Sequence, residues 1–448
     1  MTSTPSDRPL RFIHAADLHL DAAFKGIASD APASVRTALQ RATFTAFQRL
    51  VTLGCRLKPD AIILAGDIYN HEDGSLKAQL ALRDGCLRLQ DAGVRVFIAH
   101  GNHDPYPTRA ASITLPDNVS VFGTEAPDLV ELTRNGELLA VVHGISHASP
   151  RERKSLARKF KRSLHDAVQI GVLHCTLDTV AASDIYAPAT LSDLSATGLD
   201  YWALGHIHEP QVVSQNPHAV YPGSPQGLHI NEQGLHGCMI AEASLSDRDH
   251  SLNVRLFPLS PVLWKKVEVD ISGHETAEQL DDALFSAADQ SLAEELEACE
   301  AGGSVWGITP DAPEGLILRI TLTGRGPLDH LLRAQGTLAD LLERLRDTLA
   351  VQTPFIWVKD IELACRPDVD MDAQRRRPDL LGEALRTAQS LRGQGGDSAL
   401  ATHFTEALSA MFDKPRLRKA IDPPDADELA RLLDEAELLC MDLLEADQ

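Results

Sequence analysis

Residues of metal-binding type recur at the ends of apolar runs in this chain. The runs read RFIHA, AIILAG, VRVFIAHG, IGVLH and YWALG, and candidate ligands end or closely follow each of them. Buried strands that end in such residues build a site at the carboxyl edge of an open α/β sheet. We therefore expect one metal site formed by Asp17, His19, Asp67, Asn102, His174, His206 and His208.

The donor atoms of this set are oxygens and imidazole nitrogens, without a thiolate. That chemistry suits Mn²⁺, Fe²⁺ or Zn²⁺ better than a structural zinc site. One tetrahedral ion needs about four ligands, so this larger set fits two ions that share a carboxylate. Such a pair, roughly 3.5–4 Å apart, holds the attacking and leaving oxygens of a phosphoryl displacement. Asp67 is the expected bridge, because it follows a buried strand alone and has two acceptor oxygens.

Taken in order, the motifs read DxH, GD, GNHD, a later His and GHxH. A single one of them is common in proteins, whereas the ordered set is specific. The set resembles that of the calcineurin-like metallophosphoesterases over about the first 230 residues. The resemblance implies a first metal held by Asp17, His19, Asp67 and His208. It implies a second metal held by Asp67, Asn102, His174 and His206. The expected cofactors are two divalent ions, with Mn²⁺ as the first choice and Fe²⁺ or Zn²⁺ as alternatives.

The same resemblance implies catalytic roles for the last two residues of GNHD. His103 would contact the scissile phosphate and protonate the leaving oxygen, and Asp104 would orient that imidazole and keep it charged. The residues agree with this, since His103 adjoins the ligand Asn102 and can reach a substrate bound to the metals. A carboxylate partner would raise the pKa of the imidazole, which suits a general acid.

A narrower resemblance comes from the segments around the motifs. GDIYNHEDGSLKAQ, YPGSPQG and the long tail look like SbcD-type DNA-repair exonucleases, and in particular their YhaO-like branch. This implies a coiled-coil ATPase partner of the SbcC or YhaN type. The chain has no GxxxxGK[ST] motif, so an ATP-driven step would come from that partner. Relatives often carry His or Asp three residues after the bridging Asp. Here Asn70 and then His71 occupy this region, which leaves the balance of exonuclease and endonuclease activity open.

Composition sets the broad class. A chain of 448 residues exceeds one ordinary core, and 44% hydrophobic residues is ample for globular folding. The cysteines lie scattered without a CxxC pair, and no apolar run reaches the ~18 residues of a membrane helix. The first residues lack the apolar core of a signal peptide. We therefore expect a cytoplasmic protein without a membrane partner, and we expect Cys175 to be a packing residue.

The net charge of −22 counts against a nucleic-acid substrate. Two features soften the objection. Bound metals add positive charge that the count omits, and RERKSLARKFKR at 151–162 is strongly basic. This run is either a solvated helix face or a phosphate-contacting segment.

The elements that position the ligands alternate between strand and helix. We predict helices at 34–54 and 75–93 between the first strands. With the resemblance, this indicates an α/β metallophosphoesterase four-layer sandwich, two mixed sheets flanked by helices, over residues 1–260. Residues 261–365 read as β-α-β-α-β and resemble a small α/β capping domain, with helices at 276–288 and 338–349.

Residues 366–448 read as a helical C-terminal region. Two amphipathic helices are expected there, one carrying Leu400, Phe404, Leu408 and Met411, and one carrying Leu429, Leu432, Leu433, Ala436 and Leu443. The pair either packs on the body of the protein or docks on a partner.

These patterns favour a dinuclear metal-dependent DNA exonuclease or phosphodiesterase in repair or end processing, working with a coiled-coil ATPase. A homodimer is compatible with the sequence. One alternative is a metallophosphatase or phosphodiesterase for small molecules or phosphoproteins. A second is a non-enzymatic scaffold that tethers an ATPase to DNA, although no ligand is lost. Digestion polarity and strand preference are not encoded in any motif.

Overall fold

The computed structural model describes residues 8–24, 31–70, 74–106, 113–180, 184–245, 251–393 and 426–445. The chain divides into two compact units. The first comprises Met1–Thr323 and Leu331–Ala364, and the second comprises Gly324–His330 and Cys365–Gln448. His71, the first of the two predicted amphipathic helices and the GQGG joint beyond Gly393 lie outside the described residues.

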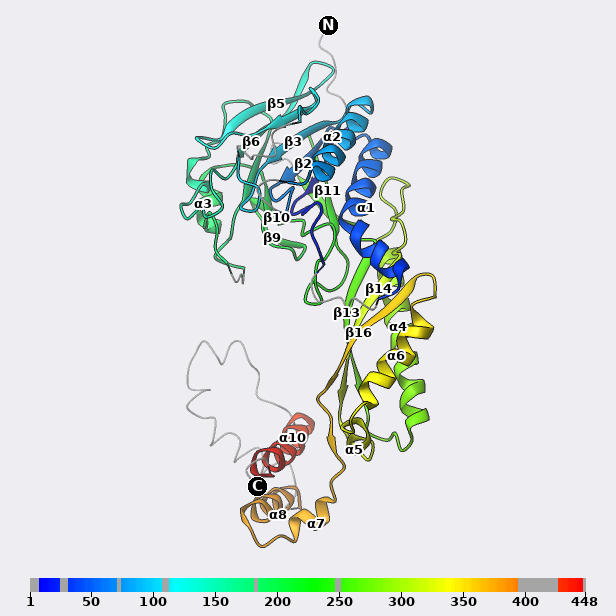
Figure 1. Ribbon diagram of the computed structural model, residues 1–448. Helices are drawn as coiled ribbons and strands as arrows, with labels where there is room; N and C mark the ends of the chain where they lie inside the picture. Colours follow the sequence, from blue (N-terminus) through cyan, green and yellow to red (C-terminus); the bar gives the residue numbers. More distant parts are fainter. Residues whose placement is uncertain are drawn as a thin grey trace. The chain divides into compact units, whose positions relative to one another are not determined.

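The first sheet of unit 1 has six strands in the order β12-β11-β1-β2-β3-β4 (Figure 1). Strands β1 to β4 are parallel, while β11 and β12 run antiparallel beside β1. Their bounds are β1 Leu10–Ala15, β2 Ala61–Ala65, β3 Arg95–Ala99, β4 Val119–Val121, β11 Gly237–Ala243 and β12 Leu252–Pro258. The helices α1 (Ala33–Leu57) and α2 (Leu76–Asp91) provide the crossovers between β1, β2 and β3, as the sequence predicted.

The second sheet also has six strands, in the order β5-β6-β7-β8-β10-β9. The bounds are β5 Asp128–Arg134, β6 Glu137–Ile145, β7 Val168–His174, β8 Tyr201–Gly205, β9 Gln211–Gln215 and β10 His218–Tyr221. Apolar side chains from both sheets, among them Phe12, Ile63, Val142 and Ile170, form one buried cluster between them. The two sheets therefore pack face to face, and the expected fold class is confirmed.

Helices cover the outer faces of this sandwich unequally. Side chains of α1 and α2 pack on β1, β2 and β3 in a large buried cluster. On the other side, the short helix α3 (Leu191–Ala196) and the 3-10 turn η1 (Ala157–Lys159) pack over Trp202 and Leu204 of β8. Cys175 lies fully buried in this cluster, so the prediction that it is a packing residue is confirmed.

A smaller domain completes unit 1. Its strands β13 (Val262–Asp270), β14 (Gly315–Thr323) and β16 (Phe355–Leu363) form a parallel sheet, connected by α4 (Ala277–Ala301) and α6 (Thr337–Leu349). This is the predicted β-α-β-α-β order. Helix α4 begins at a capping box between Thr276 and Gln279. It continues beyond the expected end at Ala288, because buried positions such as Leu292 and Cys299 recur along the same face. Trp264 and Trp357 of the sheet pack against Val35 and Leu39 of α1.

Unit 2 contains a short parallel ladder and several helices. The strands β15 (Arg325–Gly326) and β17 (Arg366–Pro367) pair with each other. Helix α5 covers Asp329–Leu332, α7 covers Met371–Arg375, α8 covers Leu380–Gly393 and α10 covers Ala426–Glu445. A small core forms where Met441 of α10 packs on Leu381 and Leu385 of α8. Helix α10 is the second of the two predicted amphipathic helices.

Two expectations about organisation have different outcomes. In the described part of the chain no helix has both the length and the apolar character required to cross a membrane. The domain boundaries at about 260 and 365, which separate 1–260, 261–365 and 366–448, stay a prediction.

Candidate metal centre

The candidate ligands lie where parallel strands of the two sheets end. Asp17 and His19 follow β1, Asp67 follows β2, Asn102 follows β3, and His174 is the last residue of β7. The loops beyond β1 and β2 are joined, since the Asp17 N–H donates to the Gly66 carbonyl and the His19 N–H to the Asp67 carbonyl, both at 3.0 Å. The sequence therefore folds these segments into one edge-of-sheet site.

The backbone at this edge is strained. Asp17, His19 and Asp67 have φ values of 52°, 41° and 49°, and His206 has a φ of 105°. Residues with a Cβ rarely adopt the left-handed region, and each such residue costs of order 1–3 kcal/mol. Concentrated strain of this kind is typical of functional sites, where the surrounding fold holds it in place.

One group of ligand atoms joins Asp17, His19 and His208. Their donor atoms all lie within 4.8 Å of one another. The Nε2 atoms of His19 and His208 face each other at 3.1 Å, and Nε2 of His208 lies 3.9 Å from Oδ1 of Asp17. Two imidazole nitrogens beside one carboxylate oxygen form a donor set that suits a divalent transition metal.

A second group forms around His174. Its Nδ1–H donates to the Ala65 carbonyl at 3.0 Å, which leaves Nε2 as the acceptor nitrogen. That Nε2 lies 3.0 Å from Oδ1 of Asn102 and 3.4 Å from Oδ2 of Asp67. A backbone carbonyl that fixes the tautomer of a histidine is a common arrangement around bound metals.

Two carboxylates lie between the groups. Oδ2 of Asp67 is 3.4 Å from Nε2 of His174 and 3.9 Å from Nε2 of His19, which supports the bridging role expected for Asp67. Asp17 also belongs to both groups, because its Oδ1 lies 4.0 Å from Nδ1 of His174. The family resemblance had placed Asp17 with one metal alone.

His206 lies beside these groups rather than within them. Its ring centroid is 5.4 Å from that of His174, and its Nε2 lies 3.1 Å from the Asp184 carbonyl. The Nε2–H donates to that carbonyl, so Nδ1 is the nitrogen that His206 can offer to an ion. Its backbone N–H donates to both carboxylate oxygens of Asp17 at 3.1 and 3.0 Å.

The electrostatics fit a cation at this position. Burial raises the pKa of Asp17 to about 6, and burial with the neighbouring Asp17 and Asp104 charges raises the pKa of Asp67 well above its ordinary value. Burial also lowers the pKa of His174 well below its ordinary value. Neither Asp17 nor Asp67 forms an ion pair with Lys or Arg within the described residues. Two buried carboxylates without a basic partner are costly, and divalent ions would offset that cost.

His103 is held beside the ligands by main-chain contacts. Its backbone N–H donates to Oδ1 of Asp67 at 2.9 Å, and its Nδ1 lies 3.1 Å from the Asn70 carbonyl. The ring packs edge-on against that of His19, with 5.0 Å between centroids.

The expectation that Asp104 orients the His103 imidazole needs correction. Asp104 is fully buried, and its Oδ2 accepts from the Ile68 N–H at 2.9 Å and lies 3.1 Å from Nδ1 of His100. Its Oδ1 accepts from the Gly101 N–H at 3.0 Å. These partners point the carboxylate into the loops after β2 and β3, so Asp104 braces the loops while the Asn70 carbonyl orients His103.

Comparison with known proteins agrees with this geometry. The profile of the calcineurin-like phosphoesterase family matches residues 10–210, and that of the YhaO metallophosphoesterase middle domain matches residues 264–366. The chain is 33% identical over 349 residues to an uncharacterized metallophosphoesterase, YhaO, of Bacillus subtilis (strain 168), covering 78% of this chain and 80% of that protein. The chain is a YhaO-like calcineurin-like metallophosphoesterase.

More distant relatives of this metallophosphoesterase are nucleases and repair proteins. It is 28% identical to the DNA double-strand break repair protein Mre11 of Aeropyrum pernix over 243 residues, which cover 50% of this chain and 55% of that protein. It is 26% identical over 259 residues to SbcD, one of the subunits of the nuclease SbcCD of Bacillus subtilis (strain 168), and these residues cover 50% and 64%. The chain thus matches less than two thirds of the length of either protein.

The structure also places residues in the site that the motifs did not indicate. Glu232 accepts a 2.7 Å hydrogen bond from Nδ1 of His208. The buried His147 lies with its Nε2 at 2.6 Å from the carbonyl oxygen of His174. Both come from segments without a metal-binding motif. The position of Glu232 shortly after YPGSPQG was its one available sequence signal.

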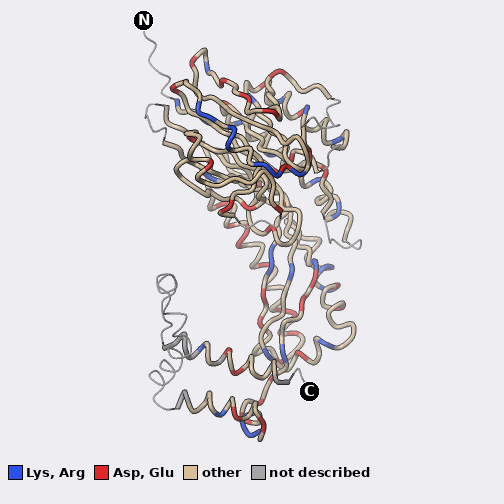
Figure 2. The backbone as a smooth tube through the Cα atoms, turned by 90° about the vertical axis from the view of Figure 1, so that its left-hand side faces the viewer, with Lys and Arg blue, Asp and Glu red and all other residues tan. Residues whose placement is uncertain are grey.

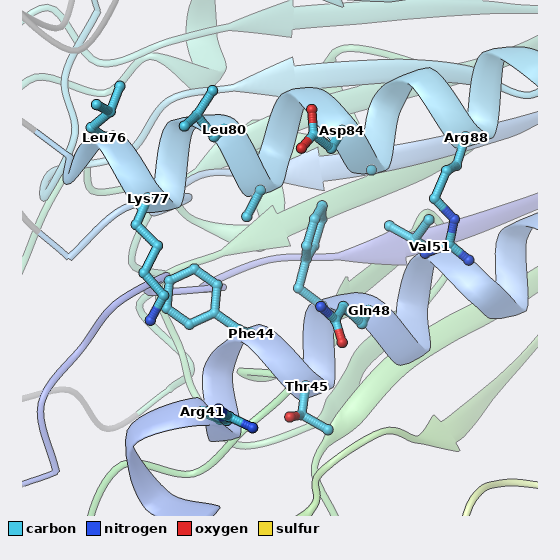
Figure 3. Close-up of a pocket in the computed structure, with 13 residues that line it drawn as sticks. Arg41, Phe44, Thr45, Gln48, Val51, Leu76, Lys77, Leu80, Asp84 and Arg88 are labelled. Atoms are coloured by element: carbon cyan, nitrogen blue, oxygen red, sulfur yellow. The ribbon is translucent and has the colours of Figure 1, made fainter. Parts of the chain in front are cut away.

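Two cavities of this metallophosphoesterase differ in their relation to the centre. A cavity of about 780 Å³ lies between α1 and α2, with Phe44, Lys77 and Arg88 among its lining residues and no candidate ligand (Figure 3). A cavity of about 430 Å³ is lined by Thr176, Leu177 and other residues just beyond the ligand His174. The second is therefore the cavity that adjoins the centre along the chain.

Proposed function

We propose that this metallophosphoesterase is a two-metal phosphodiesterase that hydrolyses DNA at or near its ends, together with a coiled-coil ATPase of the SbcC or YhaN type. The convergence of two ligand groups around Asp67 carries the proposal. The donor set suits two Mn²⁺ ions, with Fe²⁺ or Zn²⁺ as alternatives. When bound, such ions polarise a phosphoryl oxygen and stabilise the charge of an in-line displacement.

The chain's own residues would complete the reaction. Asp17, His19 and His208 would hold one ion, Asn102, His174 and His206 the other, and Asp67 would contact both. His103 donates through Nδ1–H to the Asn70 carbonyl, which leaves Nε2 to hold a proton and deliver it to the departing sugar oxygen. Because this contact uses a main-chain carbonyl, the Asn70 side chain is not needed for it.

The basic run 151–162 supports DNA as the substrate. It is not a helix face, because Ala157–Lys159 alone form a turn of 3-10 helix and Leu156 and Phe160 are buried anchors. Arg158 and Arg162 are paired with Asp193 and Asp200. The exposed cations that lack an ion pair within the described residues are Arg151, Arg153, Lys154, Lys159 and Lys161.

This run is linked to the metal centre through a neighbouring loop. The Ala187 N–H donates to the Glu152 carbonyl at 2.7 Å. Three residues earlier in the same loop, the Asp184 carbonyl contacts His206, and Tyr186 packs edge-on against the His206 ring. Along the whole described backbone, basic and acidic positions are interspersed (Figure 2), so a basic run joined to the centre is a distinct feature. Phosphates of a bound strand would be its natural partners.

The partner proposal is supported by α10. Leu432, Leu439 and Leu443 are 39%, 57% and 62% exposed, and their spacing puts them on one face of the helix. An exposed apolar stripe on an acidic helix is the surface that a coiled-coil protein can cover. A DNA-repair role follows from this pairing and from the relatives named above, as does a cytoplasmic location.

Hydrolysis of defined substrates tests the proposal. Purified protein with Mn²⁺ should release nucleotides from linear duplex DNA and hydrolyse bis-p-nitrophenyl phosphate, and the variant Asp67→Asn should do neither. Linear and closed circular DNA of the same sequence separate exonuclease from endonuclease activity. If p-nitrophenyl phosphate or a phosphopeptide is hydrolysed faster than any DNA, the alternative of a phosphatase holds and the nuclease proposal fails.

A further inference from the structure

One metal ligand is held from behind by a carboxylate that no motif indicated. Oε1 of Glu232 accepts from Nδ1–H of His208 at 2.7 Å. This contact leaves Nε2 of His208 as the ligand nitrogen, and that atom faces Nε2 of His19 at 3.1 Å. A carboxylate on the far nitrogen sets the tautomer of a ligand histidine, fixes its ring and makes it a stronger donor.

Glu232 is itself fixed on several sides. Its side chain is 11% exposed, and its Oε2 accepts from the Leu228 N–H at 2.6 Å. Its Oε1 also lies 3.2 Å from Nε2 of His229. The carboxylate thus cannot rotate away from His208 without losing a buried hydrogen bond.

The segment that carries Glu232 is anchored on the smaller domain. We call residues 226–234 the linking segment. The side chain of Gln226 pairs with Val262 of β13, with its Nε2 donating to the Val262 carbonyl at 2.7 Å. The indole N–H of Trp264 donates to the Gly227 carbonyl at 2.7 Å. The buried Ile230 packs in the cluster formed by α1 and the sheet of the smaller domain.

The residues on either side of Glu232 continue this anchoring. Oδ1 of Asn231 accepts from Nζ of Lys266 at 2.7 Å, and Oε1 of Gln233 accepts from the Lys266 N–H at 2.8 Å. Alternate residues of the linking segment therefore face two ways. Asn231 and Gln233 contact β13, whereas Glu232 contacts the metal ligand.

We propose that Glu232 is a positioning residue that holds His208 for metal binding, and that β13 of the smaller domain holds Glu232 in place through the linking segment. The inference rests on the metal centre of the proposed function. It adds a role for the smaller domain, whose placement would act on the ion held by His19 and His208 and not on the ion held by His174.

The test measures Mn²⁺ binding to the full chain, using the electron paramagnetic resonance signal of free Mn²⁺. The wild-type protein should first be shown to bind two ions, since failure there would count against the metal centre and not against Glu232. Glu232→Ala should weaken one of the two sites by about 10–100-fold and leave the other unchanged. Glu232→Gln should lose less, because the amide oxygen still accepts the hydrogen bond.

Glu209→Ala is the matched control, because it removes an exposed carboxylate from the residue next to His208. It should leave both affinities unchanged. The metal-free Glu232→Ala protein should melt within a few degrees of the metal-free control. Unchanged Mn²⁺ binding in Glu232→Ala would overturn the proposal. Equal weakening of both sites with a lower melting temperature of the metal-free protein would also overturn it, since that is the result of a general loss of structure.

A double variant tests the link to β13. Asn231→Ala with Gln233→Ala removes both side-chain contacts to Lys266 and leaves Glu232 intact. The site that Glu232→Ala weakens should weaken again by a smaller factor. Unchanged binding would overturn the role assigned to the smaller domain.

Discussion

The main-chain N–H of His103 donates a 2.9 Å hydrogen bond to Oδ1 of Asp67. The residue expected to deliver a proton is thereby tied to the carboxylate expected to hold both metals. Oδ2 of Asp67 stays directed at His174 and His19. One carboxylate thus positions the ions with one oxygen and the general acid with the other.

Asp67→Ala should remove both ions and abolish hydrolysis, because the carboxylate lies between the two ligand groups. Elemental analysis of the purified variant measures the metal content directly. Asn102→Ala is the comparison, since it should impair only the site of His174. Two retained ions per chain in Asp67→Ala would show that Asp67 does not bridge.

His103→Ala should keep both ions and lose turnover by roughly 10²–10⁴-fold on DNA. A general acid matters most when the leaving group is poor, so the loss should shrink on bis-p-nitrophenyl phosphate. Turnover numbers on both substrates provide the check. Equal losses would indicate that His103 binds the phosphate and does not protonate the leaving oxygen.

Replacing Arg151, Arg153 and Lys154 by Ser should weaken DNA binding and its salt dependence. Each lost phosphate contact should reduce the slope of log K against log salt by about 0.9 on duplex DNA. The control replaces Arg41, Lys77 and Arg88, which line the cavity between α1 and α2, and has the same change of charge. Slopes that fall equally in both variants would reflect net charge alone.

The metal-free centre should depend on pH through Asp17. Its folded-state pKa of about 6 lies above the ordinary value of 3.8, so the folded protein retains a proton that the unfolded chain releases. This contribution to stability is full below about pH 4 and is lost as the pH rises to about 6.

Asp17→Asn removes that penalty. Its free energy of unfolding, relative to wild type in EDTA, should therefore rise by roughly 3 kcal/mol between pH 4 and pH 7. Urea unfolding at several pH values measures this difference. Asp91→Asn, at an exposed carboxylate of α2, should show no such trend. A flat difference for Asp17→Asn would contradict a buried, proton-binding carboxylate.

Replacing Leu432, Leu439 and Leu443 of α10 by Asp should abolish co-purification with a coiled-coil ATPase. Hydrolysis of bis-p-nitrophenyl phosphate should persist, since every candidate ligand lies in unit 1. Substitution is cleaner than deletion of the tail, because Met441 of α10 packs on α8. Leu380→Asp changes an exposed leucine of α8 as a control. Retained co-purification of the triple variant would move the docking surface elsewhere.

The sequence by itself determined the ligand set and the principal strands, because each ligand ends or follows a continuous apolar run. The run AIILAG before Asp67 became β2, and IGVLH became β7 with His174 as its last residue. Such strands are buried on both faces and are visible in hydropathy alone. The strands β5, β9 and β12 were not predicted, because they are only partly buried and their patterns alternate or are short.

Tertiary structure alone decided the contacts of the site. Asp104 adjoins His103 in the sequence, yet its carboxylate turns to the loops after β2 and β3, since the backbone N–H groups there need an acceptor. Glu232 reaches His208 from a segment with no periodic pattern, because packing on β13 sets its position. A motif records which atoms can bind a metal, whereas the orientation of those atoms depends on hydrogen bonds between segments that are distant in sequence.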